Sequence, residues 1–193
     1  MTEQEIPNII NFIRQSWPVS EAAMSLLLSK LRAQKFPRRT ILVREGFLTG
    51  EAWFIEQGMT RSYWLVEGDE ITTSFSTSGS IVFSMDEVYY GIPSKEYVES
   101  ISPVKAYGIR VCDLMDLVST NLELCNWWRI NHQNEYRRIH RSHKERLTLD
   151  AASRYKEFSL QFPDVARNAP LNFIASYLGI SPSTLSRIRR RRY

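Results

Sequence analysis

The spacing of apolar residues changes twice along this 193-residue chain, and these changes limit the folds that it can adopt. Before Thr40, apolar positions recur at helical intervals, which predicts helices over Ile6–Trp17 and Ser20–Leu31 and then a basic link, Lys35–Arg39. From Thr40 to Ile109 the interval is two, as in strands, and after this segment it is helical again. We therefore predict an α+β chain in which an antiparallel β segment lies between two helical segments.

The central segment has the pattern of a small antiparallel barrel or sandwich. Glycines punctuate it roughly every ten residues, and short strands separated by regular turns are typical of such folds. The sequence Glu67-Gly68-Asp69 between two apolar runs predicts a hairpin turn. The runs that we expect to be strands are Ile41–Val43, Ala52–Ile55, Ser62–Val66, Ile71–Phe75, Ile81–Phe83 and Tyr97–Ile101.

A long helix is predicted soon after the β segment. A short helix, Asp113–Val118, comes first, and Asn121 is a good N-cap for a helix that continues to about Arg146. A further helix is expected over Asp150–Phe162, and Pro163 would end it.

One face of the long helix carries apolar residues near a heptad spacing, which favours a homodimer built on this helix. A helix that simply lies on the β segment stays open as the alternative. Trp127 and Trp128 are adjacent and cannot both face one side, so we expect them to bridge the seam and the β segment. The seam residues are Leu122, Cys125, Tyr136, Ile139 and Leu147, interrupted by Arg129, His132 and His143.

The most specific motif lies near the C-terminus. Leu171–Leu178 predicts one helix, Gly179-Ile180-Ser181 a turn, and Pro182 to about Arg192 a second helix. Ala175 is small enough for a close helix crossing, and Gly179 tolerates the positive φ that the turn needs. The expected shared core of the two helices is Ile174, Leu178, Ile180, Leu185 and Ile188. This pattern predicts a helix-turn-helix, although an ordinary helical hairpin with a basic tail could share parts of it.

The outward face of the second helix would then enter the major groove of DNA. Arg187 could bond a guanine edge in two places, whereas Ser183 and Thr184 are less selective readers. Arg189 to Arg192 would lie against phosphates and make binding salt-dependent. The candidate DNA-binding residues are Ser181, Ser183, Thr184, Arg187, Arg189 and Arg190.

Charge is distributed unevenly along the chain. Residues 1–120 have a net charge of −4 and residues 121–193 a net charge of +8, as expected of a sensor segment joined to a nucleic-acid-binding one. The sequence has no apolar run of membrane-spanning length and no signal-peptide pattern at its start, so we expect a cytoplasmic protein that does not enter the membrane. Cys112 and Cys125 are too few for a four-thiolate cluster, and burial of both as small apolar residues is expected over a redox pair.

Several stretches of the chain resemble the Crp/Fnr family of bacterial regulators, in particular its short Bacteroidetes type. The C-terminal stretch Ile174–Pro182, continued by Thr184–Arg189, carries the most specific similarity, and Arg154-Tyr155 is similar to a recurring pair in these proteins. The positions that are similar to the family's β-roll are Phe54–Gly58, Arg61, Gly68–Glu70 and Phe75.

The resemblance implies three segments. These are a cyclic-nucleotide-binding-like sensor β-roll of the jelly-roll type over residues 1–120, a dimerisation helix over residues 121–147, and a helix-turn-helix DNA-binding domain over residues 148–193. The sequence given ends at Tyr193, so we expect this domain to lack a full β-wing. The implied function is sequence-specific transcription regulation without enzyme activity or a cofactor; double-stranded DNA, a second copy of the chain and an unknown small-molecule effector are the expected partners.

The resemblance also places an effector pocket, but the chain departs from the family there. Relatives that bind cyclic nucleotides carry a Gly-Glu pair followed by an arginine, whereas this chain has no such pair and places Ser94 at the arginine's position. Lys95 could substitute as the cation, but Glu96 opposes it. We therefore expect a degenerate pocket that does not bind cyclic AMP. Its candidate effector-binding residues are Phe83, Ser84, Asp86, Ser94 and Lys95.

Two other function classes share parts of this pattern. A small-molecule-binding β-roll that has lost DNA binding and acts through protein contacts is one alternative. A metalloenzyme on a cupin-like barrel is the other, but residues 40–110 contain no histidine. His140 and His143 share a helix face among arginines and are interpreted as solvated or interface residues rather than metal ligands. Asp86 and Glu87 are interpreted as surface or loop-capping residues.

Overall fold

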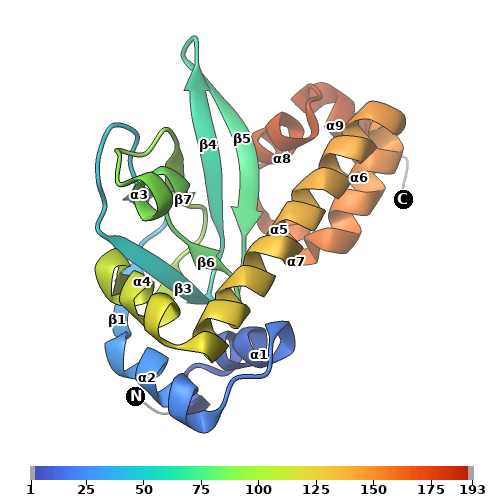
Figure 1. Ribbon diagram of the computed structural model, residues 1–193. Helices are drawn as coiled ribbons and strands as arrows, with labels where there is room; N and C mark the ends of the chain where they lie inside the picture. The colour runs from blue at the N-terminus through green and yellow to red at the C-terminus, as the bar shows by residue number, and fades with distance from the viewer. Residues whose placement is uncertain (1–2, 191–193) are drawn as a thin grey trace.

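The structure is a computed structural model that describes residues 3–190 (Figure 1). A β-roll with its flanking helices forms one end of the molecule, a long helix runs away from it, and a group of short helices gathers at the far end. The described strands are β1 (Arg32–Phe36), β2 (Ile41–Val43), β3 (Glu51–Gln57), β4 (Thr60–Val66), β5 (Asp69–Ser76), β6 (Ile81–Val82), β7 (Tyr97–Ser100) and β8 (Val104–Arg110). The described helices are η1 (Glu3–Glu5), α1 (Pro7–Ser16), α2 (Glu21–Lys30), α3 (Met85–Tyr90), α4 (Val111–Thr120), α5 (Leu122–Thr148), α6 (Ala151–Gln161), α7 (Pro163–Asn168), α8 (Leu171–Leu178) and α9 (Pro182–Arg190).

Within residues 3–190 the strands form two four-stranded antiparallel sheets, in the orders β1-β8-β3-β6 and β2-β7-β4-β5. The sheets face each other around a small core that includes Val43, Ile55 and Val98. The predicted antiparallel β segment and the α+β class are therefore confirmed. The β4–β5 hairpin closes with Val66 opposite Asp69, and the two turn residues Glu67 and Gly68 both have positive φ, as the predicted tight turn requires.

A second apolar layer covers the outer face of the β1-β8-β3-β6 sheet. Helices α1, α2 and α4 and the start of α5 pack there, as the lower part of Figure 1 shows. Trp127 is fully buried and stacks on Phe54 of β3, with 6.1 Å between ring centroids. Trp128 is also buried in this layer, with its ring 6.0 Å from that of Trp127. The expectation that one indole would face a dimer seam is therefore wrong, because both are used to anchor α5 to the roll.

Side-chain caps fix several helix starts. Ser20, Asn121 and Asp150 each accept a backbone N–H at the start of α2, α5 and α6, respectively. The Ser20 and Asn121 caps confirm the predicted starts of these helices. Buried Glu56 at the end of β3 accepts the backbone N–H groups of Asn8 and Ile9 at 3.2 and 3.1 Å, which places a carboxylate at the positive end of α1.

The structure also corrects several sequence-based expectations. The proposed basic link contains the end of β1, because Lys35 and Phe36 pair with β8. Neither β1 nor β8 is among the predicted strands. Pro163 ends α6 but also starts α7 at once, since proline is tolerated in the first turn of a helix. The thiols of Cys112 and Cys125 are exposed and free, so their expected burial is wrong. No helix within residues 3–190 has both the length and the apolar character needed to cross a membrane.

Candidate nucleic-acid interface and sensor loop

Helices α8 and α9 form the predicted pair around a turn that glycine makes possible. Gly179 ends α8 in the left-handed region with φ of 65°, and the N–H of Ile180 bonds back to the carbonyl of Ala175 at 3.0 Å. Ser181 accepts the N–H of Thr184 at 3.1 Å and so caps the start of α9. The predicted turn and cap are both confirmed.

The expected core beneath the two helices is present. Ile174, Ala175 and Leu185 are completely buried, and Leu178 is nearly so. Ile180 and Ile188 are partly buried against the same cluster. Burying these side chains fixes the rotation of α9 about its axis, so its other face is presented to solvent.

The exposed start of α9 carries the predicted reading residues. Ser183 and Arg187 are exposed and Thr184 is half-buried. The Ser181 hydroxyl lies 2.9 Å from those of Ser183 and Thr184, and Arg187 donates to the Thr184 hydroxyl at 3.3 Å. These weak, local bonds hold the four side chains together on one face without burying any of their donors.

The basic end of α9 is less uniform than expected. Arg190 is exposed, whereas Arg189 is half-buried and donates to the carbonyl of Ala166 in α7 at 3.1 Å. Arg189 therefore helps to hold α9 on α7 in this structure. The predicted extension of the helix to Arg192, with the phosphate contacts expected of Arg191 and Arg192, lies outside the described residues.

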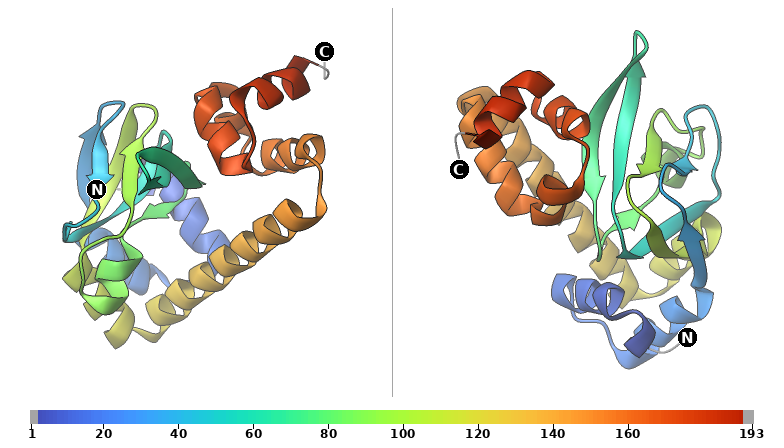
Figure 2. Two further views of the ribbon diagram at one scale, coloured as in Figure 1. Left: turned by 90° about the horizontal axis from the view of Figure 1, so that it is seen from above. Right: turned by 180° about the vertical axis from the view of Figure 1, so that it is seen from behind.

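Helix α8 is docked on the β-roll, which the sequence did not predict. It lies beside β5 at the roll's long hairpin (Figures 1 and 2). The Ser176 hydroxyl accepts the N–H of Thr72 at 2.9 Å and donates to the carbonyl of Glu70 at 3.1 Å. Phe75 of β5 joins the core of the C-terminal helices and lies 5.5 Å, between ring centroids, from Tyr177.

A buried arginine forms the centre of this contact. The Arg61 side chain on β4 is only 2% exposed, forms ion pairs with Glu70 and Glu99, and has its guanidinium 3.4 Å from the ring centre of Phe173 on α8. The two ion pairs hold the guanidinium within the roll, and its cation–π contact with Phe173 links the roll to α8. Arg61 is one of the positions similar to the family's β-roll, but nothing in the sequence indicates its partner Phe173, 112 residues further along the chain.

The proposed dimer seam on α5 is exposed. Leu122, Tyr136, Ile139 and Leu147 are each between 54% and 76% exposed, and Cys125 is exposed as well. Of the interrupting residues, His132 turns toward the roll, where its Nε2 lies 2.6 Å from the Tyr89 hydroxyl and its ring 4.6 Å from that of Trp128. His140 and His143 are exposed.

The predicted effector residues surround helix α3, a helix that is not among those predicted from the sequence. Ser84 is buried and caps α3 by accepting the N–H of Glu87. Asp86 accepts the N–H of Lys95 at 3.0 Å, and Glu87 accepts those of Thr49 and Gly50 at 2.8 and 2.6 Å. Asp86 and Glu87 thus cap neighbouring loops, as interpreted from the sequence.

The residues after α3 also form hydrogen bonds within their own loop. Ser94 is buried, and its hydroxyl bonds only to the backbone of Glu96 among the residues that the structure describes. Burial, together with the nearby Asp86 carboxylate, raises the pKa of Glu96 to about 7. Lys95 is exposed, whereas Phe83 packs 5.3 Å from Trp128 at the base of α5.

Comparison with known proteins identifies the fold. No protein-family model and no curated protein matches the sequence. Among solved structures, the chain is similar to the c-di-GMP-responsive global regulator CLP of Xanthomonas campestris, with a TM-score of 0.68 and 16% identity over 89% of this chain and 91% of that one. It is also similar to FixK2 of Bradyrhizobium japonicum, with a TM-score of 0.71 and 17% identity over 83% of each chain.

A proposed transcriptional regulator of the Crp/Fnr family from Eubacterium rectale gives a TM-score of 0.71 and 16% identity over 92% of this chain and 87% of that one. Each of these similarities covers more than four-fifths of both chains. The chain therefore has the fold of these proteins, a cyclic-nucleotide-binding-like β-roll joined by a long helix to a C-terminal helix-turn-helix.

Proposed function

We propose that this protein is a homodimeric, sequence-specific DNA-binding transcription regulator of the Crp/Fnr type, without enzyme activity. The observation that carries the proposal is the exposed start of α9, where Ser183, Thr184 and Arg187 project from a helix whose opposite face is buried. Between Pro182 and Arg190 the helix has three arginines and no acidic residue, which suits the negative potential of a DNA groove.

The dimer is the second part of the proposal. Large apolar side chains such as Leu122, Tyr136, Ile139 and Leu147 rarely stand exposed along one helix unless a partner covers them. Two α5 helices that pair through this seam would be related by a two-fold axis. The two α9 helices would then address half-sites about one helical turn apart on a pseudo-palindromic sequence.

We also propose that the roll does not bind cyclic AMP. The N–H groups of Thr49, Gly50 and Lys95 are already bonded to the carboxylates of Asp86 and Glu87. A cyclic phosphate would have to displace these carboxylates and would be repelled by them. Calorimetry with cyclic AMP should accordingly give no saturable heat, and binding at one molecule per chain would contradict this part.

The DNA proposal is tested by selecting binding sites from random double-stranded DNA with the full chain. We expect enrichment of a pseudo-palindrome, and the Arg187→Ala variant should relax the choice of base at one position in each half-site. Arg167→Ala is the matched control, since Arg167 is an exposed arginine on α7 paired with Asp164. Absence of DNA binding at low salt would contradict the proposal. DNA binding without sequence preference, together with specific binding of a small molecule, would also contradict it and would favour a ligand-binding module.

A further inference from the structure

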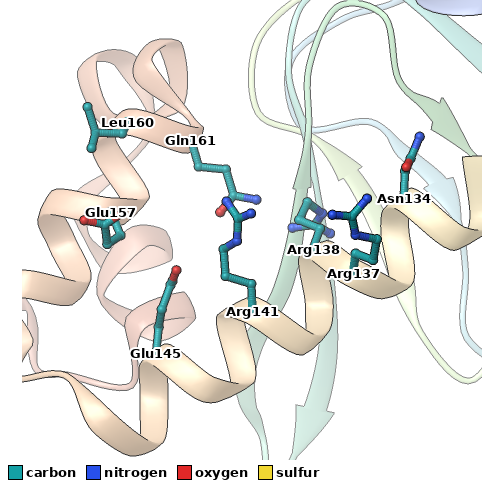
Figure 3. Close-up of a pocket in the computed structure, with 8 residues that line it drawn as sticks. All are labelled: Asn134, Arg137, Arg138, Arg141, Glu145, Glu157, Leu160 and Gln161. Atoms are coloured by element: carbon teal, nitrogen blue, oxygen red, sulfur yellow. The ribbon is translucent and has the colours of Figure 1, made fainter. Parts of the chain in front are cut away.

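A groove between α5 and α6 gathers charged side chains that no part of the proposed function uses (Figure 3). Its volume is about 440 Å³, which is within the range of small-molecule sites. Arg137, Arg138 and Arg141 line it from α5, and Gln161 lines it from the end of α6. Figure 3 shows Arg137, Arg138 and Arg141 following one another along α5.

The three arginines are not equally neutralised. Arg138 pairs with Glu135 and donates to the hydroxyl of Ser74 on β5 at 3.1 Å. By contrast, Arg137 and Arg141 are exposed and form no ion pair in the part of the chain that the structure describes, and Arg141 interacts with Glu145, one helical turn further on, only at longer range. These two residues are one helical turn apart, where like charges repel each other and an anion placed between them is favoured.

The other end of the groove limits what the anion can be. Glu145 of α5 and Glu157 of α6 face the groove there (Figure 3). A strand of nucleic acid or another extended polyanion would bring its next charge against these carboxylates. A ligand with its negative charge concentrated at one end and a neutral, hydroxyl-rich remainder would match both ends.

The groove lies where a bound ligand would contact several parts of the molecule at once. Helices α5 and α6 form its two walls, and the chain passes from one to the other through Leu149 and Asp150. Arg138 reaches β5 on the roll and lies over the ring of Phe162, 5.6 Å from its centre. A ligand held here would therefore contact the long helix and the C-terminal helices together, next to the surface that docks on the roll.

We propose that this groove binds a compact phosphate monoester, with the phosphate held by Arg137, Arg141 and Arg138 and the amide of Gln161 beside it. Arginine is well suited to this role because its planar fork can donate two parallel bonds to one phosphate. The site lies outside the roll pocket and does not depend on DNA binding.

The test uses the full chain and three probes: ribose 5-phosphate, inorganic phosphate and uncharged ribose. Calorimetry should give one saturable site per chain for ribose 5-phosphate, weaker binding of inorganic phosphate and none of ribose. The double variant Arg137→Ala/Arg141→Ala should weaken binding of ribose 5-phosphate at least about ten-fold, as expected from the loss of charge-assisted bonds. The control Lys156→Ala removes an exposed cation from α6 outside the groove lining and should leave binding unchanged.

Three results would overturn the proposal. One is equal, weak binding of inorganic phosphate and ribose 5-phosphate that the double variant leaves unchanged, which would be non-specific anion binding. Another is absence of saturable binding in a wild-type chain that unfolds cooperatively. The third is a wild-type chain that binds no phosphate ester while the double variant binds DNA more weakly and with less dependence on salt. That result would mean that the two arginines contact the DNA backbone. Both arginines are exposed, so the variants should melt at the wild-type temperature, and a melting curve verifies this.

Discussion

The α8–α9 unit and the α3 loop both contain a helix with a serine N-cap, but the side chains that follow the cap differ in what they bind. Each has a helix that begins at a serine N-cap, Ser181 for α9 and Ser84 for α3. At α9 the side chains beyond the cap, Ser183, Thr184 and Arg187, are exposed or half-buried and, among residues 3–190, bond only to one another and to the cap. At α3 the side chains beyond the cap, Asp86 and Glu87, accept backbone N–H groups of the neighbouring loops.

The difference shows that a capped helix end does not define a binding site by itself. What matters is whether the donors around it remain free. Basic and hydroxyl side chains follow the cap at α9, so the end is suited to an anionic partner. Two carboxylates follow the cap at α3, and they satisfy the donors that an anionic ligand would otherwise use.

The largest expected effect concerns Arg61, which lies buried between the roll and α8. Arg61→Ala should lower the free energy of unfolding by about 3–5 kcal/mol, because it leaves Glu99 without its cation and removes the contact with Phe173. Urea denaturation measures the loss. The control Arg167→Ala breaks an exposed ion pair and should cost at most about 1 kcal/mol. Equal small effects of the two changes would mean that the docked interface contributes little to stability.

The next effect concerns the closed loop and depends on pH. The folded-state pKa of Glu96, about 7, is above its ordinary value of 4.5, so the neutral acid favours the folded state. This contribution is complete below about pH 4.5 and is lost as the pH rises through about 7. Glu96→Gln should therefore raise stability by on the order of 1–3 kcal/mol at pH 8 and change it little at pH 4.5.

Thermal unfolding at both pH values measures the Glu96 effect. Glu67→Gln in the β4–β5 turn is the control, since Glu67 is exposed. If the stability difference between Glu96→Gln and the wild type were the same at pH 4.5 and pH 8, the loop around α3 would be open to water.

The smallest effect compares the two serine caps directly. Ser84→Ala and Ser181→Ala should each cost about 1 kcal/mol of stability, the usual effect of losing an N-cap. Only Ser181→Ala is expected to weaken DNA binding as well, because its hydroxyl also organises Ser183 and Thr184. Fluorescence anisotropy with labelled DNA separates the two. Similar losses of DNA affinity in both variants would remove the distinction between the two helix ends.

The parts that sequence could predict are those held by local rules. Gly179 with φ of 65°, the Ser181 and Asn121 caps and the Glu67-Gly68 turn each depend on neighbouring residues, and each was found as predicted. Helix α3 is only six residues long and carries no clear apolar period, so it could not be recognised.

Long-range contacts account for the errors at the two tryptophans, at α8 and at Arg189. The side chains of Trp127 and Trp128 share one cluster because α1, α2 and β3 surround the start of α5, which no local pattern encodes. The docking of α8 on β5 joins Thr72 to Ser176, and Arg189 turns back to Ala166 for a similar reason. A single sequence gives no direct information on such pairs, because each contact depends on the final arrangement of the elements.

The most direct test of the central claim compares Arg187→Ala with Arg190→Ala on the selected DNA site and on an unrelated duplex, each over a range of salt concentrations. We predict that Arg187→Ala weakens binding to the selected site by about 5- to 150-fold and lowers the ratio between the two DNAs. Arg190→Ala should weaken both equally and reduce the salt slope by about one. If Arg187→Ala left the ratio unchanged, α9 would not be the element that reads the sequence.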